Sequence, residues 1–310
     1  MERYINSFAT ENDIQTALQN GELLKPYVAY IEDADRIDWN SKEIVDYTTE
    51  YLTFNITSNG NINVPTGTTY SINGAEWENT GTTITVNSGE TIRFKGNNSA
   101  YNNSTFNGST ASFEVEGNIM SLIYGDNFKN NSTISSDNAF YGLFSNCTGL
   151  TSAENLILPA TTLTMNSYNS MFYKCKSLTT APKLPATTLA PTCYSHMFEG
   201  CTSLTTAPVL PVTTLVYVCY YYMFNGCTSL TTAPELPATT LAVYCYQNMF
   251  YKCTSLNYIK CLATNISASD CTSFWVGNVA STGTFVKNPN MTSWPTGVSG
   301  IPTGWTVQDA

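Results

Sequence analysis

Hydrophobic and polar positions recur with a fixed period over the second half of the chain. The clearest unit is MFEGCTSLTTAPVLPVTTLVYVCYYY, residues 197–222. Two columns of cysteines each keep a spacing of 26 residues: Cys175, Cys201, Cys227 and Cys253, and then Cys193, Cys219, Cys245 and Cys271. An earlier copy begins near Phe140 and places Cys147 28 residues before Cys175. A period of this length is typical of a stacked solenoid, whose units bury their apolar faces against their neighbours.

The spacing inside one unit predicts a short helix. Five apolar side chains follow the spacing of one helical face, with the last just past the helix end: Cys193, Met197, Phe198, Cys201 and Leu204. The following SLTTAP indicates a short extended segment, and the next residues a turn-rich return. We therefore expect an α/β solenoid of about five rungs over residues 136–280. Its last unit is degenerate, as is typical of a cap, because Trp275 replaces the column methionine.

Residues 51–135 alternate apolar and polar positions with period 2, separated by turn signals. EYLTFNITS, NINV, TTYSINGAEW, TTITVNSGETIRFKG and TASFEVEGNI are the expected strands. We expect a small antiparallel all-β domain here, either a sandwich or a barrel, with Trp77 and Phe94 in its core.

Residues 1–50 form an acidic leader with too little apolar surface for its own core. Helical spacing over 13–20 precedes a predicted strand over 26–31 and an acidic connector over 32–41. Such a segment is expected to dock on another protein. At the other end, residues 281–310 are expected to be a coil or cap, with Trp294 and Trp305 packed on the last rung.

Charge and cysteine content narrow the classes of function. The net charge is −10 and only 12% of residues are charged, so we expect no nucleic-acid partner. The sequence has no apolar run long enough to cross a bilayer and no Sec-type signal, so we expect no membrane insertion and synthesis in a cytoplasm. Nine of the ten cysteines follow the repeat period and the tenth, Cys261, lies in the last unit, so all are expected to be buried, reduced thiols. No pattern of metal ligands, cofactor-binding loop or catalytic nucleophile is present.

Positions that vary among otherwise identical copies are candidate contact residues, because the scaffold does not dictate them. We select five: His196, Tyr217, Tyr221, Tyr222 and Tyr244. They would form an aromatic strip that stacks on sugar rings or packs on a protein partner. Three further tyrosines are instead expected to be half-buried against the next rung: Tyr194, Tyr220 and Tyr246. We expect His196 to be a surface residue without a catalytic role.

The repeated F-x-x-C-T-S-L-T-x-A-P-x-L-P motif resembles the leucine-rich repeats of the BspA-like family. These repeats are common in Bacteroidales surface proteins and gut bacteriophages. The resemblance implies a curved α/β solenoid and adhesion. KPYVAYIEDADRIDWN, residues 25–40, is similar to amino-terminal segments of virion proteins in phages of gut Bacteroidales, including crAss-like phages. It implies a virion-anchoring segment, with these residues: Pro26, Tyr27, Val28, Tyr30, Ile31 and Trp39.

These observations favour a non-enzymatic virion protein, such as a head fibre or tail appendage. Its leader would contact other virion proteins, and its repeats would contact a glycan or protein of a host surface or mucosa. We also expect a homo-oligomer. The alternative is a bacterial cell-surface adhesin. A glycan-active enzyme is a remote alternative, because it needs two carboxylates facing one cleft, and the repeats are poor in acids.

Overall fold

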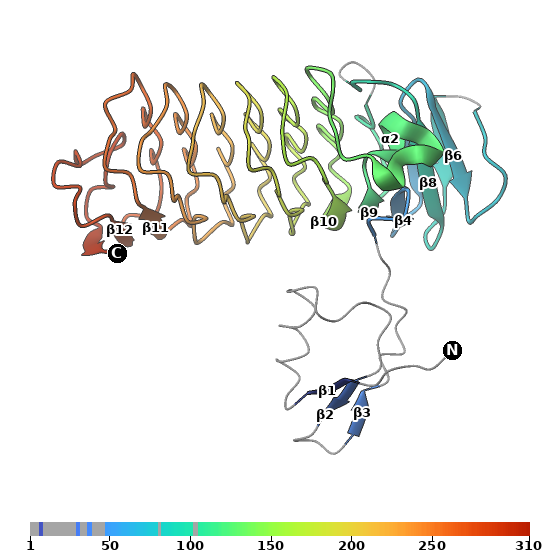
Figure 1. The fold of residues 1–310 in the computed structure, drawn as a ribbon, viewed down its shortest axis with the longest axis horizontal. Coiled ribbons are helices and arrows are strands. Elements are labelled where there is room, and N and C mark those ends of the chain that lie inside the picture. The colour runs from blue at the N-terminus through green and yellow to red at the C-terminus, as the bar shows by residue number, and fades with distance from the viewer. Residues whose placement is uncertain (1–5, 9–28, 32–35, 39–46, 80–81, 102–104) are drawn as a thin grey trace. The chain divides into compact units, whose positions relative to one another are not determined.

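The computed structural model describes residues 6–8, 29–31, 36–38, 47–79, 82–101 and 105–310 (Figure 1). The chain divides into two compact units, residues 1–46 and 47–310. In the first, β1 (Asn6–Phe8) pairs in parallel with β2 (Ala29–Ile31), which pairs antiparallel with β3 (Arg36–Asp38).

The predicted anchoring segment is described only in part. Tyr30 and Ile31 belong to β2. The other selected residues of this segment lie outside the described residues: Pro26, Tyr27, Val28 and Trp39. The predicted helix over 13–20 lies outside them as well.

The second unit begins with a five-stranded sheet in the order β10-β9-β4-β8-β6. Its strands are β4 (Leu52–Ile56), β6 (Thr68–Ile72), β8 (Thr91–Gly96), β9 (Phe113–Asn118) and β10 (Leu150–Ile157). A separate antiparallel pair joins β5 (Gly60–Asn63) to β7 (Thr83–Val86). Strands therefore lie in all the segments where period-2 alternation predicts them.

The predicted antiparallel sandwich or barrel is wrong. Among the described residues no barrel closes, since the main sheet ends at β6 on one side and at β10 on the other. The physical reason is that β10, from the first repeat, pairs in parallel with β9 and extends the sheet. Residues 51–135 and the repeats consequently share one sheet and one compact unit.

Aromatic side chains fill the core under the main sheet. The Phe54 ring lies 4.7 Å from that of Phe94, 4.6 Å from Phe106 and 4.5 Å from Phe113, between centroids. Phe94 is fully buried, as predicted. Trp77 is only half-buried and lies at the edge, where the Lys95 ammonium is 4.3 Å from its ring centroid.

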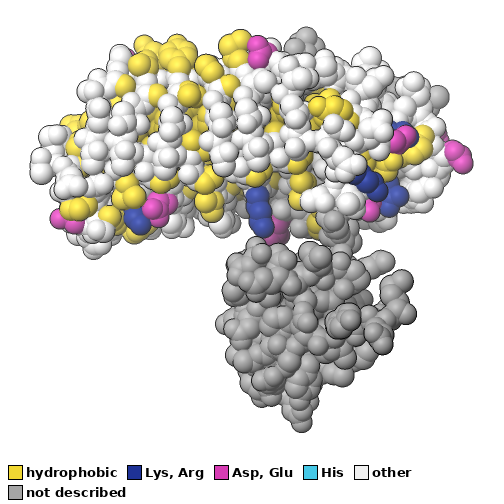
Figure 2. Space-filling model, viewed as in Figure 1, with side chains coloured by type: hydrophobic (Ala, Val, Ile, Leu, Met, Phe, Trp, Pro, Cys, Tyr) yellow, Lys and Arg dark blue, Asp and Glu magenta, His cyan; other side chains and the backbone are white. Residues whose placement is uncertain are grey.

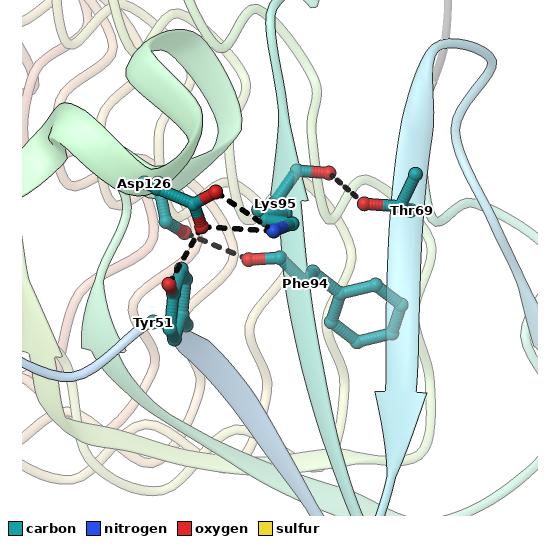
Figure 3. Close-up of polar contacts among 6 residues, drawn as sticks. Tyr51, Thr69, Phe94, Lys95 and Asp126 are labelled. Atoms are coloured by element: carbon teal, nitrogen blue, oxygen red, sulfur yellow. Dashed lines mark hydrogen bonds and ion pairs between the residues drawn. The ribbon is translucent and has the colours of Figure 1, made fainter. Parts of the chain in front are cut away.

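The connection between the sheet and the repeats consists of α2 (Ser121–Tyr124) and the 3₁₀-helix η2 (Gly125–Asn130). A polar network holds this connection against the sheet (Figure 3). The Asp126 carboxylate accepts two hydrogen bonds from Lys95 Nζ, at 2.8 and 3.0 Å, and one from the Tyr51 hydroxyl at 2.7 Å. The Lys95 ammonium, followed by the Tyr51 hydroxyl, lowers the pKa of Asp126. Burial, followed by the hydrogen bond to Asp126, raises the pKa of Tyr51 to about 12.

The repeated units stack side by side along the rest of the chain (Figure 1). One column of phenylalanine rings runs through the stack with centroids 5.4 to 5.7 Å apart: Phe144, Phe172, Phe198, Phe224 and Phe250. A second column of tyrosine rings has centroids 5.9 to 6.2 Å apart: Tyr168, Tyr194, Tyr220 and Tyr246. Isolated parallel bridges such as Thr180 with Thr206 join neighbouring units. Each unit therefore buries its apolar side against the next.

The predicted α/β leucine-rich-repeat solenoid is wrong, because the units contain turns where helices are expected. In the described part of the chain the only α-helix is α2, which precedes the repeats. Thr192, Tyr194 and His196 all have φ between 47° and 59°, a left-handed conformation that interrupts a right-handed helix. The N–H of His196 donates to the carbonyl of Tyr221 in the next unit at 2.8 Å, rather than to its own unit. The apolar side chains therefore keep the predicted spacing, but the backbone that carries them forms turns instead of a helix.

The cysteines are buried thiols, as predicted. All ten are free and buried. In the first column each Sγ lies within hydrogen-bond distance of a phenylalanine carbonyl of the preceding unit, for example Cys201 with Phe172 at 3.0 Å and Cys227 with Phe198 at 3.1 Å. Desolvation by burial raises the pKa of the column thiols, that of Cys253 to about 12. The thiols therefore pack as small apolar groups, and their hydrogen bonds to carbonyl groups link one unit to the next.

The far end of the stack is covered by a parallel sheet of β11 (Tyr258–Cys261), β12 (Thr284–Lys287) and β13 (Thr306–Asp309). Trp275 stacks on Trp294 with centroids 5.6 Å apart. Trp305 Nε1 donates to the Ala280 carbonyl at 2.8 Å. The predicted packing of Trp294 and Trp305 on the last rung is confirmed. Among the described residues no helix is long and apolar enough to cross a membrane.

Candidate ligand-binding surface

Backbone geometry sorts the variable tyrosines into buried and outward positions. Tyr194, Tyr220 and Tyr246 are each 1% exposed, and their rings stack between neighbouring units. Their predicted packing against the next rung is confirmed and is more complete than the half-burial expected. Of the residues that follow them, Tyr221 and Tyr222 are half-buried, whereas Ser195 and Asn248 are buried. The side chains of Tyr221 and Tyr222 therefore remain partly available for ligand contact.

Three of the predicted contact residues form what we call the ring cluster: His196, Tyr221 and Tyr222. The His196 ring lies 5.2 Å from that of Tyr221, edge-on, and 5.1 Å from that of Tyr222, stacked. The two tyrosine rings are 4.5 Å apart. His196 Nδ1 also lies 2.5 Å from Glu199 Oε2. Sequence reasoning selects the three rings correctly as neighbours but misses their acidic partner.

The other two predicted residues, Tyr217 and Tyr244, form an edge-on pair with centroids 5.9 Å apart. Tyr217 is 52% exposed, and Tyr244 is half-buried. Tyr217 lies close enough to the ring cluster to influence Tyr221. Burial is the largest cause of the raised pKa of Tyr221, and the neighbouring Tyr222, Glu199 and Tyr217 raise it further. The five predicted residues thus gather in two adjacent groups on neighbouring units.

An exposed apolar row continues from Tyr217. Met165, Pro191, Tyr217 and Val243 occupy one position in successive units, because their carbonyls accept equivalent hydrogen bonds from the unit before. Met165 is 45% exposed. Figure 2 shows hydrophobic side chains along the upper edge of the repeats, whereas charged side chains gather at the lower edge and near the β-sheet end. The face is thus suited to stacking and packing contacts, with few charges.

A hollow of about 590 Å³ adjoins the ring cluster on its amino-terminal side. Its walls and floor include Tyr141, Ser145, Ser170, Tyr173, His196 and Glu199, and Thr105 and Asn107 line it from the segment before β9. Apart from His196, none of these residues is selected by sequence reasoning.

The hollow exists because one column of positions changes in size along the stack. The same position is occupied in turn by Gly142, Ser170, His196 and Tyr222, whose N–H groups donate to equivalent carbonyls of the next units. The two small residues leave space, and the imidazole of His196 bounds it. A comparison of the first two copies with the later ones would reveal this gradient. The five predicted contact residues all lie in the later copies, where the small residues of this column are absent.

The described lining of the hollow contains few ionisable groups. Glu199 is the one carboxylate lining the hollow, and it is already paired with His196. Among the described residues no group of three or more His, Cys, Asp or Glu side chains is placed to hold a metal ion. Aromatic rings, hydroxyls, an amide and one carboxylate can hold a ligand by stacking and hydrogen bonds.

Comparisons of the chain with protein-family models, with curated proteins and with solved structures found no match.

Proposed function

We propose that this chain is a non-enzymatic binding protein that contacts glycans or surface proteins through the aromatic face of its repeats. The observation that carries the proposal is that each unit holds two kinds of aromatic side chain in different places. The rings that recur in every copy stack in the core, whereas the rings that differ, His196, Tyr221 and Tyr222, meet on the outer face. A rigid scaffold that presents aromatic side chains at low entropic cost favours recognition. The repeat motif, which resembles BspA-like repeats, supports the same role.

A glycan and protein array tests this proposal. The full chain is compared with a double variant that carries Tyr221→Ala and Tyr222→Ala, and with Tyr251→Ala as a control outside the ring cluster. Loss of two stacking rings should weaken binding by about 1–3 kcal/mol, which is about five- to 150-fold, at about 0.5–1.5 kcal/mol for each aromatic pair. Binding that is equal in the double variant and the control would refute the assignment to the ring cluster.

We extend the proposal to the setting in which the protein acts. The likeness of residues 25–40 to segments of phage virion proteins supports a virion component, anchored through its leader to other virion proteins. Deletion of residues 1–45 should abolish incorporation into purified particles, measured by mass spectrometry, while near-ultraviolet circular dichroism of the isolated variant stays unchanged. Normal incorporation would contradict the anchoring role. Recovery of the intact protein in a bacterial envelope fraction would instead support the cell-surface adhesin.

Self-association is part of the same proposal. We expect the full chain to form a homo-oligomer, and light scattering coupled to size-exclusion chromatography measures its mass directly. A monomer over the whole accessible concentration range would remove this part of the proposal and leave the binding face unaffected.

A further inference from the structure

We propose that the hollow beside the ring cluster is a binding site for a neutral saccharide. The inference rests on the proposed glycan-binding function and adds a place and a ligand class to it. The hollow measures about 590 Å³, which lies within the usual range of small-molecule sites. It crosses three consecutive units, which contribute Tyr141, then Ser170 and Tyr173, then His196 and Glu199.

Two tyrosines at the hollow offer stacking surfaces for sugar rings. Tyr141 is 39% exposed even though its hydrophobic ring is large, and Tyr173 is half-buried. The Lys174 ammonium lies 4.7 Å from the centroid of the Tyr173 ring, a cation–π contact that restrains the ring. The C–H face of a pyranose stacks on such rings, because they combine a flat apolar surface with little loss of entropy.

Polar groups at the hollow supply directional bonds for hydroxyls. Glu199 Oε2 pairs with His196, while its other carboxylate oxygen has no hydrogen-bond partner in the described part of the chain and can accept from a ligand. Within the same described residues the side-chain amide of Asn107 is also without a partner, and it can both donate and accept. One fixed acceptor and one amide beside aromatic rings suit a polyhydroxylated ligand.

Charge selects among the sugars. Among the described residues the lining contains one carboxylate, Glu199, and no lysine or arginine. The whole chain carries a net charge of −10. An acidic sugar or a phosphate would be repelled by Glu199, and the nearest cation, Lys174, already lies against the Tyr173 ring and interacts with Glu199, whereas a neutral saccharide meets no such repulsion. The site should therefore discriminate against uronic and sialic acids.

Isothermal titration calorimetry with the full chain tests the inference. The probes are neutral oligosaccharides (cello-, malto-, xylo- and chito-oligosaccharides) and acidic ones (oligogalacturonate and sialyllactose). We expect at least one neutral probe to bind and the acidic probes to bind at least tenfold more weakly. Failure of every neutral probe, or a preference for an acidic one, would overturn the inference.

Three variants locate the binding. Tyr173→Ala and Glu199→Gln should each weaken binding of the neutral probe at least fivefold. Ser170→Tyr should abolish it by filling the floor, and this substitution copies Tyr222, which occupies the same column at nearly the same φ, 57° against 56° for Ser170. The matched control is Tyr251→Ala, because Tyr251 lies outside the hollow and carries an equivalent lysine, Lys252, 5.3 Å from its ring centroid.

The outcomes separate this inference from the proposed function. If the Tyr221 and Tyr222 double variant loses the ligand while Ser170→Tyr keeps it, the ring cluster binds and the hollow does not. If Ser170→Tyr loses the ligand while Tyr251→Ala keeps it, the hollow is the site. Equal losses in Tyr173→Ala and Tyr251→Ala would also overturn the inference. Unchanged unfolding midpoints confirm that the variants remain folded.

Discussion

Replacing Tyr168 by phenylalanine should stabilise the repeat stack. The Tyr168 ring is 0% exposed and lies between the rings of Phe140 and Tyr194, at centroid distances of 5.7 and 5.9 Å. Its hydroxyl is buried and has no hydrogen-bond partner among the described residues. Burial alone raises the pKa of this phenol, which reflects the same loss of solvation. Phenylalanine keeps the stacked ring and removes the unpaired polar atom.

The size of the effect follows from desolvation. A buried hydroxyl without a partner costs about 1–3 kcal/mol. The substitution also gives up no ring–ring contact and creates a space of only one oxygen atom, so little of that gain is offset. We therefore expect the free energy of unfolding to rise by about 1–2 kcal/mol.

Tyr101→Phe provides a matched control of the opposite sign. The Tyr101 ring is also 0% exposed, and it stacks on the other side of the same Phe140, with centroids 6.3 Å apart. Its hydroxyl, however, accepts a hydrogen bond from Thr68 Oγ1 at 3.1 Å. Removing that acceptor leaves the buried Thr68 hydroxyl unpaired, so this variant should lose about 1–3 kcal/mol.

Equilibrium unfolding in guanidinium chloride, followed by circular dichroism, measures both variants against the parent chain. Equal slopes are required for the midpoints to be compared as free energies. The reasoning is refuted if Tyr168→Phe is neutral or destabilising, or if the two variants shift the midpoint in the same direction.

Three further predictions concern the thiols, the ring column and the polar network. Because burial raises the pKa of the thiols, iodoacetamide at pH 8 should leave the native protein almost unmodified. Cys271 should be alkylated first, since it is 3% exposed and the other cysteines are 0% exposed. Rapid modification of all ten cysteines would contradict this prediction. Phe198→Ala should lose about 3–5 kcal/mol in chemical unfolding, because its ring stacks on both sides; a loss below about 1 kcal/mol would show that the column contributes little. Asp126→Asn should cost at most about 1 kcal/mol at pH 7, because the carboxylate is exposed. The pKa of Asp126 is lowered in the folded state, so this contribution is present above the unfolded value of about 3.8 and disappears as the pH falls through the folded one. Thermal melts should therefore show the parent more stable than the variant at pH 7 and a smaller difference between the two at pH 2.5.

Much of the burial pattern can be predicted from the repeat alone. Cys201 and Phe198 recur in every comparable copy because stacking requires them, and both are fully buried. The period also predicts correctly that Tyr194 and Tyr220 pack between units. Alternation with period 2 is equally informative for β7 and the first half of β9, where buried and more exposed positions alternate.

The backbone of each unit could not be predicted in the same way. Apolar spacings of three and four residues fit a helix, but they also fit a chain in which alternate residues adopt positive φ. The choice depends on where each N–H donates. His196 donates to Tyr221 and Phe198 to Met223, both in the next unit, and such acceptors exist only once the units are stacked. Local spacing carries no information about them.

The candidate site likewise has one part that could be predicted from the sequence and one part that could not. The sequence by itself determined that certain aromatic side chains vary between copies, and these are the residues that form the ring cluster. Only the tertiary structure decided that the column from Gly142 to Tyr222 runs beside Tyr141 and Tyr173 to form a hollow, because a hollow is a property of several units held in register. The sequence period specified what repeats, and the hydrogen bonds between units specified how the repeats fold and which side chains meet.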